Sequence, residues 1–307
     1  MMRLGMIGLD TSHVPAFARL LTASDRPSPL DRVQLVAAVA GGSPGFPMSR
    51  DRVEGYTAEV AAMGVTIVPN LRDLLECCDG IMIQSVDGRQ HLEQAAPVFG
   101  AGKPVFIDKP LAASLTDVLA IAELGKSTGV PWFTASSMRY SPGYPELRQD
   151  LSIGQIVGCD TFGPSRMMPG HPDLFWYGVH GVDLLYSFLG TGCQQVWAVQ
   201  TPFTELVMGR WQDGRIGTFR GIREETGCSG WGAAVFGTTG NRHVTNSYDY
   251  SALVNQIVHF FLSGRSPVSD AEMVEVFAFL SAAEASRNCD GKPVNLSQVI
   301  DGARQGG

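Results

Sequence analysis

A short apolar strand that ends in an acid, a lysine and a proline is the part of this sequence most able to do chemistry. Residues 105–107 are Val, Phe and Ile, and Asp108, Lys109 and Pro110 follow them directly. In an open α/β sheet, ligands bind at the carboxyl ends of the strands. Proline fixes its own φ there and has no N–H to donate. This placement predicts that Lys109 acts on a ligand, whereas an isolated Asp-Lys-Pro tripeptide is more often a solvated turn.

A glycine turn near the N-terminus is the second candidate. The stretch Leu-Gly-Met-Ile-Gly, which ends at Gly8, leads from a strand into a helical segment, as a dinucleotide fingerprint requires. A full G-x-G-x-x-G would have glycine where this chain has Asp10 and His13, and a carboxylate close to a pyrophosphate would repel it. Asp10, Thr11 or Ser12 can instead cap the helix, whose N-terminal amides still form an anion site. The turn predicts either a nucleotide site or a capped turn without one.

The residues after the second strand leave the choice of nucleotide open. Gly41, Gly42 and Ser43 stand where an acid would normally meet the ribose 2′-hydroxyl of NAD. Ser43 and Arg50 could meet the 2′-phosphate of NADP, although a surface arginine in a loop is the simpler interpretation. The sequence therefore allows NAD or NADP.

Composition favours a globular protein that acts on small molecules. With 307 residues and 44% hydrophobic content the chain can form a substantial core, and its charged content of 17% indicates apolar surface that oligomerisation would cover. The net charge is −7, and the sequence contains no block of like charges. Both facts argue against nucleic acid or an anionic membrane as a partner. No apolar run has the length of a membrane span and no leader pattern is present. We expect a cytoplasmic homodimer or homotetramer.

Neither a metal site nor a disulfide framework is expected. The six cysteines show no CxxC spacing, and the six histidines do not pair with them. Cys77 and Cys78 are adjacent at an expected helix end, which suits reduced, buried thiols.

The pattern of elements predicts two domains. Strands are expected at residues 4–7, 33–40, 66–68, 81–84, 105–107 and 132–135, with helices near 14–23, 49–63, 71–77, 90–101 and 115–128. This alternation predicts βαβ units and a doubly wound parallel sheet over residues 1–136. After residue 136 the strands follow one another, at 155–162, 195–201, 204–211, 215–222 and 231–238. They predict an α+β domain over 137–307 with a mostly antiparallel sheet, one helix from about His180 to Gly190 and two closing helices. The capping-box spacing of Ser269 and Glu272 marks the start of the last one.

Several motifs, in this order, resemble those of the Gfo/Idh/MocA family of sugar and polyol oxidoreductases. They are the Gly8 turn, the run from His91 to Ala112, the pair Arg139-Tyr140, the segment Gly178–Asp183 and the stretch Gly291–Val294. The similarity extends over essentially the whole chain. It implies a Rossmann domain, a nicotinamide cofactor and a carbohydrate-like substrate. The cofactor-binding residues that it suggests are Gly8, Asp10, Thr11, Ser12, His13, Ser85, Asp108, Lys109 and Pro110.

The same resemblance assigns the catalytic roles. The family's E-K-P motif corresponds to Asp108-Lys109-Pro110, which implies that Lys109 lies beside the nicotinamide and stabilises an alkoxide. Its D-x-G-x-H motif corresponds to residues 176–180, so His180 is the expected general base. Asp183 shares a helix face with His180 and is expected either to orient it or to bind a substrate hydroxyl, unless it simply favours the start of a helix.

Trp176 is the main departure from the family pattern, because it replaces the motif's aspartate and removes a carboxylate that would support His180. Trp176 and Tyr177, with Phe175, are expected to form an aromatic wall for a sugar ring or to pack between domains. Arg139 and Tyr140 are expected to contact substrate, with a structural ion pair as the alternative for Arg139. A later group, Arg166, His171 and Asp173, is a weaker candidate.

Three functions remain open at this point. The first is a dehydrogenase that moves hydride between a secondary alcohol and a nicotinamide. The second uses a retained cofactor for net elimination, hydration, isomerisation or glycoside cleavage. The third is a binding protein that has lost its nucleotide.

Overall fold

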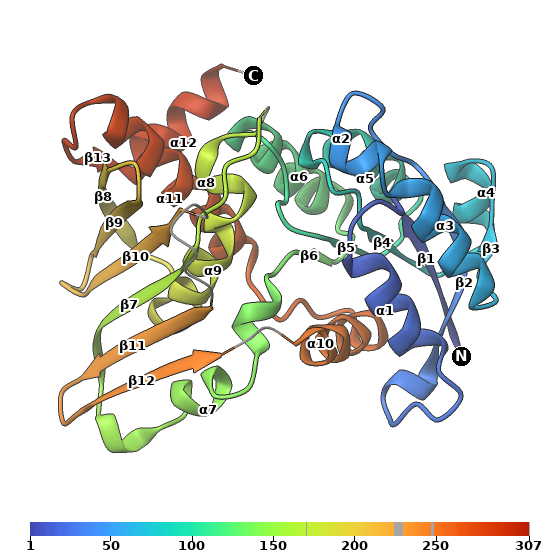
Figure 1. Cartoon of the computed structure of the whole chain (residues 1–307), viewed down its shortest axis with the longest axis horizontal. Coiled ribbons are helices and arrows are strands. Elements are labelled where there is room, and N and C mark those ends of the chain that lie inside the picture. Colours follow the sequence, from blue (N-terminus) through green and yellow to red (C-terminus); the bar gives the residue numbers. More distant parts are fainter. Residues whose placement is uncertain (170, 224–229, 247–248, 307) are drawn as a thin grey trace. The chain divides into compact units, whose positions relative to one another are not determined.

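The computed structural model describes residues 1–169, 171–223, 230–246 and 249–306. The chain forms two compact units that are not linear halves (Figure 1). The first contains residues 1–113, 120–134 and 250–269, and the second contains 114–119, 135–249 and 270–307. A single division after residue 136 would place residues 250–269 with the wrong unit.

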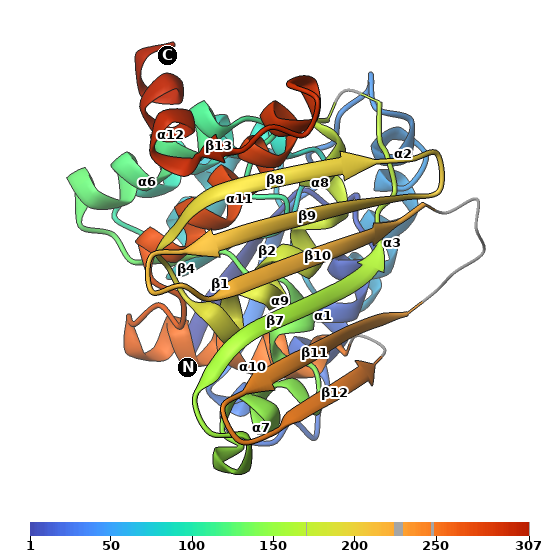
Figure 2. The same ribbon diagram turned by 90° about the vertical axis from the view of Figure 1, so that its left-hand side faces the viewer.

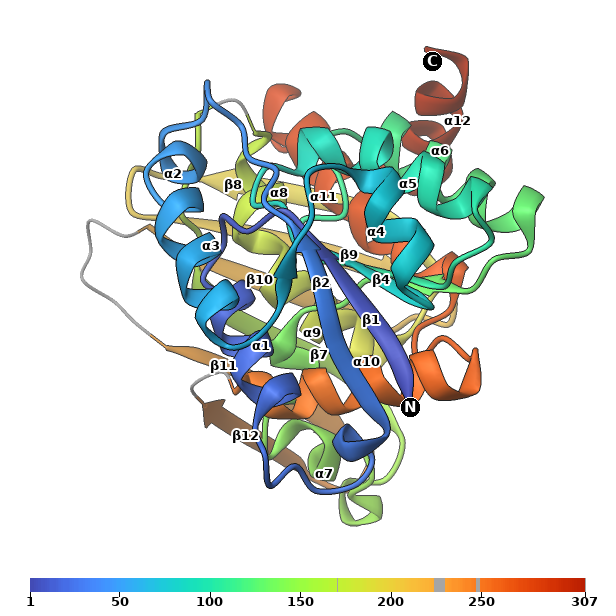
Figure 3. The ribbon, with the colours of Figure 1, turned by 90° about the vertical axis from the view of Figure 1, so that its right-hand side faces the viewer.

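The first unit is built on a parallel six-stranded sheet with the order β3-β2-β1-β4-β5-β6. This is the order of a Rossmann fold, and Figure 3 shows β1 and β2 side by side. Its central strands are apolar along their whole length because helices cover both faces of the sheet. The strands are β1 (Met2–Ile7), β2 (Val33–Val39), β3 (Thr66–Ile67), β4 (Gly80–Ile83), β5 (Val105–Ile107) and β6 (Trp132–Phe133).

Most helices of this unit lie between consecutive strands, as expected. The stretch expected as one helix at 49–63 is divided into two in the structure. The helices are α1 (His13–Thr22), α2 (Pro47–Arg50), α3 (Val53–Ala62), α4 (Leu71–Cys77), α5 (His91–Gly100) and the part of α6 (Leu115–Thr128) that follows residue 119.

A helix from far along the chain, α10 (Tyr250–Ser263), completes the first unit. Phe260 of α10 packs on Phe133 of β6 with ring centroids 4.9 Å apart, and Phe261 lies so close to Gly80 of β4 that a side chain there would clash with it. The N-terminal end of α10 meets α1, where Tyr250 contacts the ring of His13 at 4.7 Å. Residues distant in sequence therefore pack against the candidate cofactor end of this unit.

The second unit contains a seven-stranded sheet with the order β12-β11-β7-β10-β9-β8-β13 (Figure 2). Neighbouring strands are antiparallel except for β7 and β10, which are parallel. The sequence did not predict the two edge strands, β12 and β13. The strands are β7 (Ile156–Pro164), β8 (Cys193–Gln200), β9 (Thr204–Trp211), β10 (Ile216–Ile222), β11 (Trp231–Gly237), β12 (Asn241–Asn246) and β13 (Val294–Asn295).

Helices α9 (Gly178–Leu189) and α11 (Asp270–Asn288) pack on one face of this sheet. Contact between α9 and β10 depends on Gly181, since a Cβ there would lie 2.2 Å from the ring of Phe219. The expectation that the helix announced by Ser269 and Glu272 is the last one is wrong, because α12 (Leu296–Gln305) follows it. Two short helices, α7 (Tyr144–Arg148) and α8 (Asp173–Trp176), complete the unit.

Candidate functional site

The turn after β1 brings three strand ends together at the carboxyl edge of the parallel sheet. Gly8 has a φ of +82°, and a Cβ on it would lie 2.1 Å from the hydroxyl of Ser85, so the position requires glycine. Its backbone N–H donates to the carbonyl of Val39 at the end of β2. Gly8 itself adds no side chain to this turn, as is required of the first glycine of a dinucleotide-binding turn.

Asp10 turns inward and does not face a phosphate at this turn. Its side chain is fully buried and accepts hydrogen bonds from the backbone N–H of Val86 at 2.8 Å and from the hydroxyl of Ser49 at 2.6 Å. Burial raises the pKa of Asp10, although these hydrogen bonds oppose the rise. Ser12 stands at the N-cap of α1, and within this described segment its side chain makes no capping hydrogen bond. Neither of these two side chains makes the capping hydrogen bond that the sequence allowed, while the repulsion of a pyrophosphate by Asp10 stays a prediction.

His13, at the position of the third glycine, is also part of an internal network. Its Nδ1 lies 2.5 Å from Oδ2 of Asp108, and both side chains are buried. The other carboxylate oxygen of Asp108 accepts from the backbone N–H of Lys109 at 2.8 Å. Burial raises the pKa of Asp108, but His13 and Lys109 outweigh this and hold it below its usual value. This network joins the start of α1 to the loop that carries Lys109.

Lys109 lies directly after β5, half-buried, as its position in the sequence predicted. The bond between Lys109 and Pro110 is cis. Burial lowers the pKa of Lys109, and the neighbouring Asp108 carboxylate opposes that effect. An ammonium held in a partly desolvated place stabilises a negative charge more strongly than one in bulk water.

Two more side chains join loops at the same edge. His91, fully buried at the start of α5, contacts the carbonyl oxygens of Ser85 and Leu111 at 2.8 and 3.1 Å. Gln84, between β4 and Ser85, is fully buried, and both of its carboxamide atoms are without a hydrogen-bond partner among the described residues. Buried polar groups are nearly always satisfied, so Gln84 indicates a polar group, such as a water or a ligand, beside it.

The loop after β2 contacts an acid that the sequence analysis did not consider. The Ser43 hydroxyl donates to Asp87 at 2.8 Å, and the guanidinium of Arg89 binds both oxygens of the same carboxylate. Arg89 also lies over the ring of Phe46. Arg50, the other residue proposed to meet a 2′-phosphate, pairs with Asp51 on the surface, as the simpler interpretation predicted.

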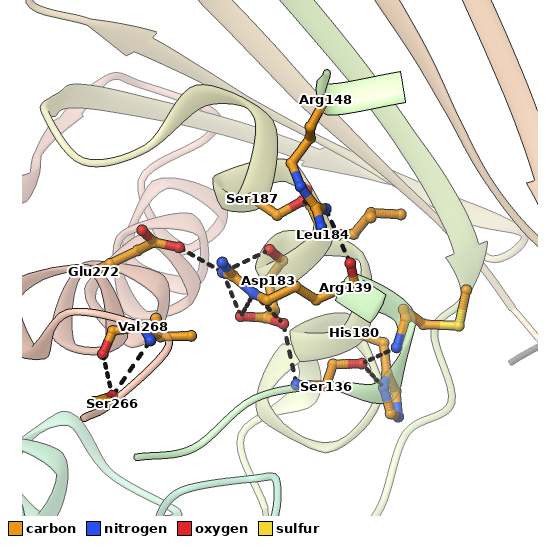
Figure 4. A network of polar contacts seen from close by, with 11 residues as sticks. Ser136, Arg139, Arg148, His180, Asp183, Leu184, Ser187, Ser266, Val268 and Glu272 are labelled. Carbon is orange, nitrogen blue, oxygen red and sulfur yellow. Dashed lines mark hydrogen bonds and ion pairs between the residues drawn. The ribbon is translucent and has the colours of Figure 1, made fainter. Parts of the chain in front are cut away.

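In the second unit, His180 lies in the first turns of α9 beside a serine (Figure 4). Its Nδ1 is 2.6 Å from the hydroxyl oxygen of Ser136, which also accepts from the backbone N–H of Met138. The imidazole ring also contacts the rings of Tyr177 and Trp231, with centroids 5.5 and 5.1 Å away. When Nδ1–H donates a hydrogen bond to this hydroxyl, Nε2 carries the lone pair with which an imidazole acts as a base.

Asp183, one turn along α9, binds Arg139 (Figure 4). Arg139 donates through Nη2 to Oδ1 of Asp183 at 2.9 Å and to Oε1 of Glu272 at 2.5 Å, and all three side chains are largely buried. Oδ2 of Asp183 accepts from the backbone N–H of Ser136 at 3.0 Å. The structural ion pair considered for Arg139 is therefore present, and Asp183 reaches His180 through Ser136.

Tyr140 follows Arg139 in a short 3₁₀ turn (Ser137–Tyr140). Its hydroxyl is buried without a partner among the described residues, and burial raises the pKa of the phenol. Its expected contact with substrate stays a prediction, as does that of Arg139.

The aromatic residues before α9 pack against nearby polar side chains. Trp176 is buried and contacts the ring of His171 at 4.9 Å, while the guanidinium of Arg166 lies 5.1 Å from the ring centre of Tyr177. The side chain of Asp173 lies outside the described residues. Whether Trp176 and Tyr177 contact a sugar stays a prediction.

Comparison with known proteins decides the family of the first unit's main segment. Residues 2–136 match the model of the oxidoreductase family with an NAD-binding Rossmann fold, GFO_IDH_MocA. These residues belong to the Gfo/Idh/MocA family. The resemblance stated from the motifs is thereby confirmed, and so is the expectation of a nicotinamide dinucleotide as the cofactor of this family domain.

The relatives and the structural neighbours extend this picture. Inositol 2-dehydrogenase 3 of Saccharopolyspora erythraea is 28% identical over 156 residues, which are 50% of this chain and 39% of that protein. This chain therefore spans well under two thirds of the length of that relative. A probable dehydrogenase of Thermotoga maritima shares the fold with a TM-score of 0.78 at 19% identity, over 97% of this chain and 100% of that one. Scyllo-inositol dehydrogenase of Lactobacillus casei, solved with NAD(H) and scyllo-inositol, has a TM-score of 0.77 at 14% identity, over 97% and 99%.

The residues of this Gfo/Idh/MocA domain fit a dinucleotide. Gly8 makes the turn tight without a side chain, Val86 and Ser49 engage the carboxylate of Asp10, and the buried carboxamide of Gln84 has no hydrogen-bond partner among the described residues. Residues 8–13 would hold the pyrophosphate, and Lys109 would lie at the nicotinamide end.

None of the helices that the structure describes is long and apolar enough to cross a membrane.

Four residues at these sites were missed by sequence reasoning. Single serine, glutamine and acidic residues carry no motif, and their partners lie up to 133 positions away in the sequence. Glu272 had been noticed only for its capping-box spacing. They are Gln84, Asp87, Ser136 and Glu272.

Proposed function

We propose that this protein is an NAD(P)-dependent oxidoreductase that oxidises a secondary alcohol of a sugar, a polyol or a derivative. The observation that carries the proposal is the position of Lys109, half-buried at the carboxyl end of β5 in a domain of an NAD-binding oxidoreductase family. The bound nicotinamide would supply hydride acceptance. The protein's own residues would bind the alcohol, remove its proton and stabilise the charge on its oxygen.

Lys109 and His180 divide the chemistry of the hydroxyl in this proposal. The O–H proton goes to Nε2 of His180, which can accept it when Nδ1–H donates to Ser136. The Lys109 ammonium stabilises the resulting alkoxide, whose C–H hydride then leaves as the carbonyl forms. Asp183 positions this machinery through the backbone of Ser136, and its charge is balanced by Arg139.

The substrate class rests on the relatives. Proteins named inositol dehydrogenases occur among both the sequence relatives and the structural neighbours. The aromatic residues Trp176 and Tyr177 are suited to lie against the apolar face of a sugar or cyclitol ring. We therefore propose a carbohydrate-like substrate rather than nucleic acid.

A second candidate uses the same residues without net oxidation. His180 contacts the hydroxyl of Ser136, and Trp176 stands where the family motif has an aspartate, so the motif's own carboxylate is missing from this chain. A transiently oxidised ring carbon acidifies the neighbouring C–H, which permits elimination, isomerisation or glycoside cleavage with a retained cofactor. This alternative would return the nicotinamide to its starting state in each cycle.

One assay separates these functions. The purified protein is incubated with NAD⁺ or NADP⁺ and a panel of inositols, sugars and sugar acids, and the nicotinamide absorbance and the products are followed together. A sustained rise in reduced nicotinamide supports the dehydrogenase, and a product without net reduction supports the second candidate. Absence of nucleotide binding at near-millimolar concentration would contradict both and leave a binding protein.

We also propose that the protein is a homodimer or a homotetramer. In the second unit α9 and α11 pack on one face of the seven-stranded sheet. The alternation along the strands places the exposed apolar side chains of Val199, Ile216 and Phe236 on the opposite face. Covering such a face is a common reason for association. Native mass spectrometry would test this, and a monomer at micromolar concentration would contradict it.

A further inference from the structure

His13, Asp108 and Lys109 form a continuous chain of contacts within the first unit. Nδ1 of His13 lies 2.5 Å from Oδ2 of Asp108, and Oδ1 of Asp108 accepts from the backbone N–H of Lys109 at 2.8 Å. Both oxygens of one carboxylate are thus engaged, one by α1 and one by the loop after β5. Because an ionised carboxylate only accepts hydrogen bonds, Nδ1 carries the proton of the first contact.

The packing around His13 fixes the direction of its ring. The imidazole stacks on Phe17 with centroids 5.6 Å apart and contacts Tyr250 of α10 at 4.7 Å, and the residue is 5% exposed. Within the described part of the chain, the ionisable groups that contact it are Asp108 from the end of β5 and the Tyr250 phenol. Lys109 and His91 interact electrostatically with Asp108, and His91 also interacts with Asp10.

We propose that His13 is a positioning residue for Lys109, acting through the carboxylate of Asp108 that the two residues share. The proposal rests on the catalytic role proposed for Lys109. It also explains a departure from the dinucleotide fingerprint, since a glycine at position 13 could not hold Asp108.

The charges along this chain define what His13 does beyond packing. Burial raises the pKa of Asp108, and the contacts with His13 and Lys109 outweigh this effect and lower it below its usual value. Burial lowers the pKa of Lys109, and the Asp108 carboxylate opposes the decrease. Removing His13 would therefore favour protonation of Asp108, and the loss of that negative charge would make the Lys109 ammonium release its proton at lower pH.

The chain suits a direct measurement, because it contains only four lysines. Protein labelled with ¹³C-lysine gives few side-chain signals, and a Lys109→Arg variant identifies the signal of Lys109. Its titration is followed by NMR in the wild type and in His13→Gln, which removes the imidazole and keeps a polar side chain. His259→Gln, the same change at an exposed position on α10, is the matched control.

We expect the titration midpoint of Lys109 to move to lower pH in His13→Gln, with the other three lysines unchanged. His259→Gln should leave all four signals in place. A Lys109 midpoint that stays within the variation of the other lysines in folded His13→Gln would overturn the proposal. So would an equal shift in the control.

A second variant covers the case in which His13→Gln does not fold. Asp108→Asn keeps an oxygen for the Lys109 N–H and removes the charge, so it should lower the Lys109 midpoint. Adding His13→Gln to it should cause no further shift. An unchanged midpoint in Asp108→Asn, or fully additive shifts, would contradict the shared carboxylate. Because no substrate is present, a failure here is distinct from a failure to find oxidoreductase activity.

Discussion

Removal of the Asp183 carboxylate should be among the most damaging single changes in the second unit. Asp183→Ala leaves the buried guanidinium of Arg139 with Glu272 as its described carboxylate partner, and it removes the acceptor of the Ser136 N–H. Breaking a buried ion pair by removing one partner costs about 3–5 kcal/mol, and an orphaned buried donor costs about 1–3 kcal/mol. Because Glu272 still compensates part of the Arg139 charge, we expect a loss of about 3 kcal/mol.

The assay is urea denaturation followed by tryptophan fluorescence, since Trp231 contacts His180 in the same unit. The matched control is Asp301→Ala, which removes an aspartate from a solvent-exposed pair with Arg304 in α12. Exposed pairs contribute little to stability, so the control should unfold like the wild type. Equal losses in the two variants, or an unchanged transition in Asp183→Ala, would refute the reasoning that the Arg139 network holds this unit together.

Three further changes test the individual site residues. Lys109→Met should lower kcat by roughly 10²–10³-fold, as loss of an oxyanion donor does, without destabilising the fold; turnover near the wild-type rate would argue against its role. Ser136→Ala should lower kcat by no more than the roughly 10²–10⁴-fold that acid–base catalysis contributes, and should move the acidic limb of the rate profile if it orients His180; an unchanged profile would count against it. Burial raises the pKa of Asp10, so its stabilising contribution is present below the unfolded pKa of about 4 and is lost as the pH rises through the folded pKa. Asp10→Asn should therefore gain stability relative to the wild type between acidic and neutral pH in urea titrations, and parallel curves would contradict this.

The architecture of the first unit could be predicted because its signals are local. Six apolar strands alternate with helical segments, and the expected strand at 105–107 coincides with β5. In the second unit, the expected strand at 204–211 coincides with β9. The short edge strands β12 and β13 carry little apolar pattern, and the membership of α10 in the first unit depends on packing by Phe260 and Phe261. Such long-range packing leaves no local signal in a single sequence.

The positions of site residues could be predicted where those residues directly follow strands. The hydrogen-bond partners of buried side chains could not. The placement of Lys109 after β5 followed from the sequence, as did the buried turn at Gly8. The inward turn of Asp10 did not, because it depends on Val86 and Ser49, which arrive from two other loops. A missing glycine in a fingerprint is thus weak ground for rejecting a nucleotide site.

The most direct test of the proposed function is a comparison of wild-type protein and Lys109→Met in a single-turnover mixture with excess enzyme, NAD⁺ or NADP⁺, and the best alcohol from the substrate panel. Nucleotide binding is measured on the same samples by fluorescence. We predict that the wild type forms one reduced nicotinamide per carbonyl product, and that Lys109→Met binds nucleotide but forms neither at a comparable rate. Reduction at the wild-type rate in the variant, or product without any transient reduction in the wild type, would contradict the account.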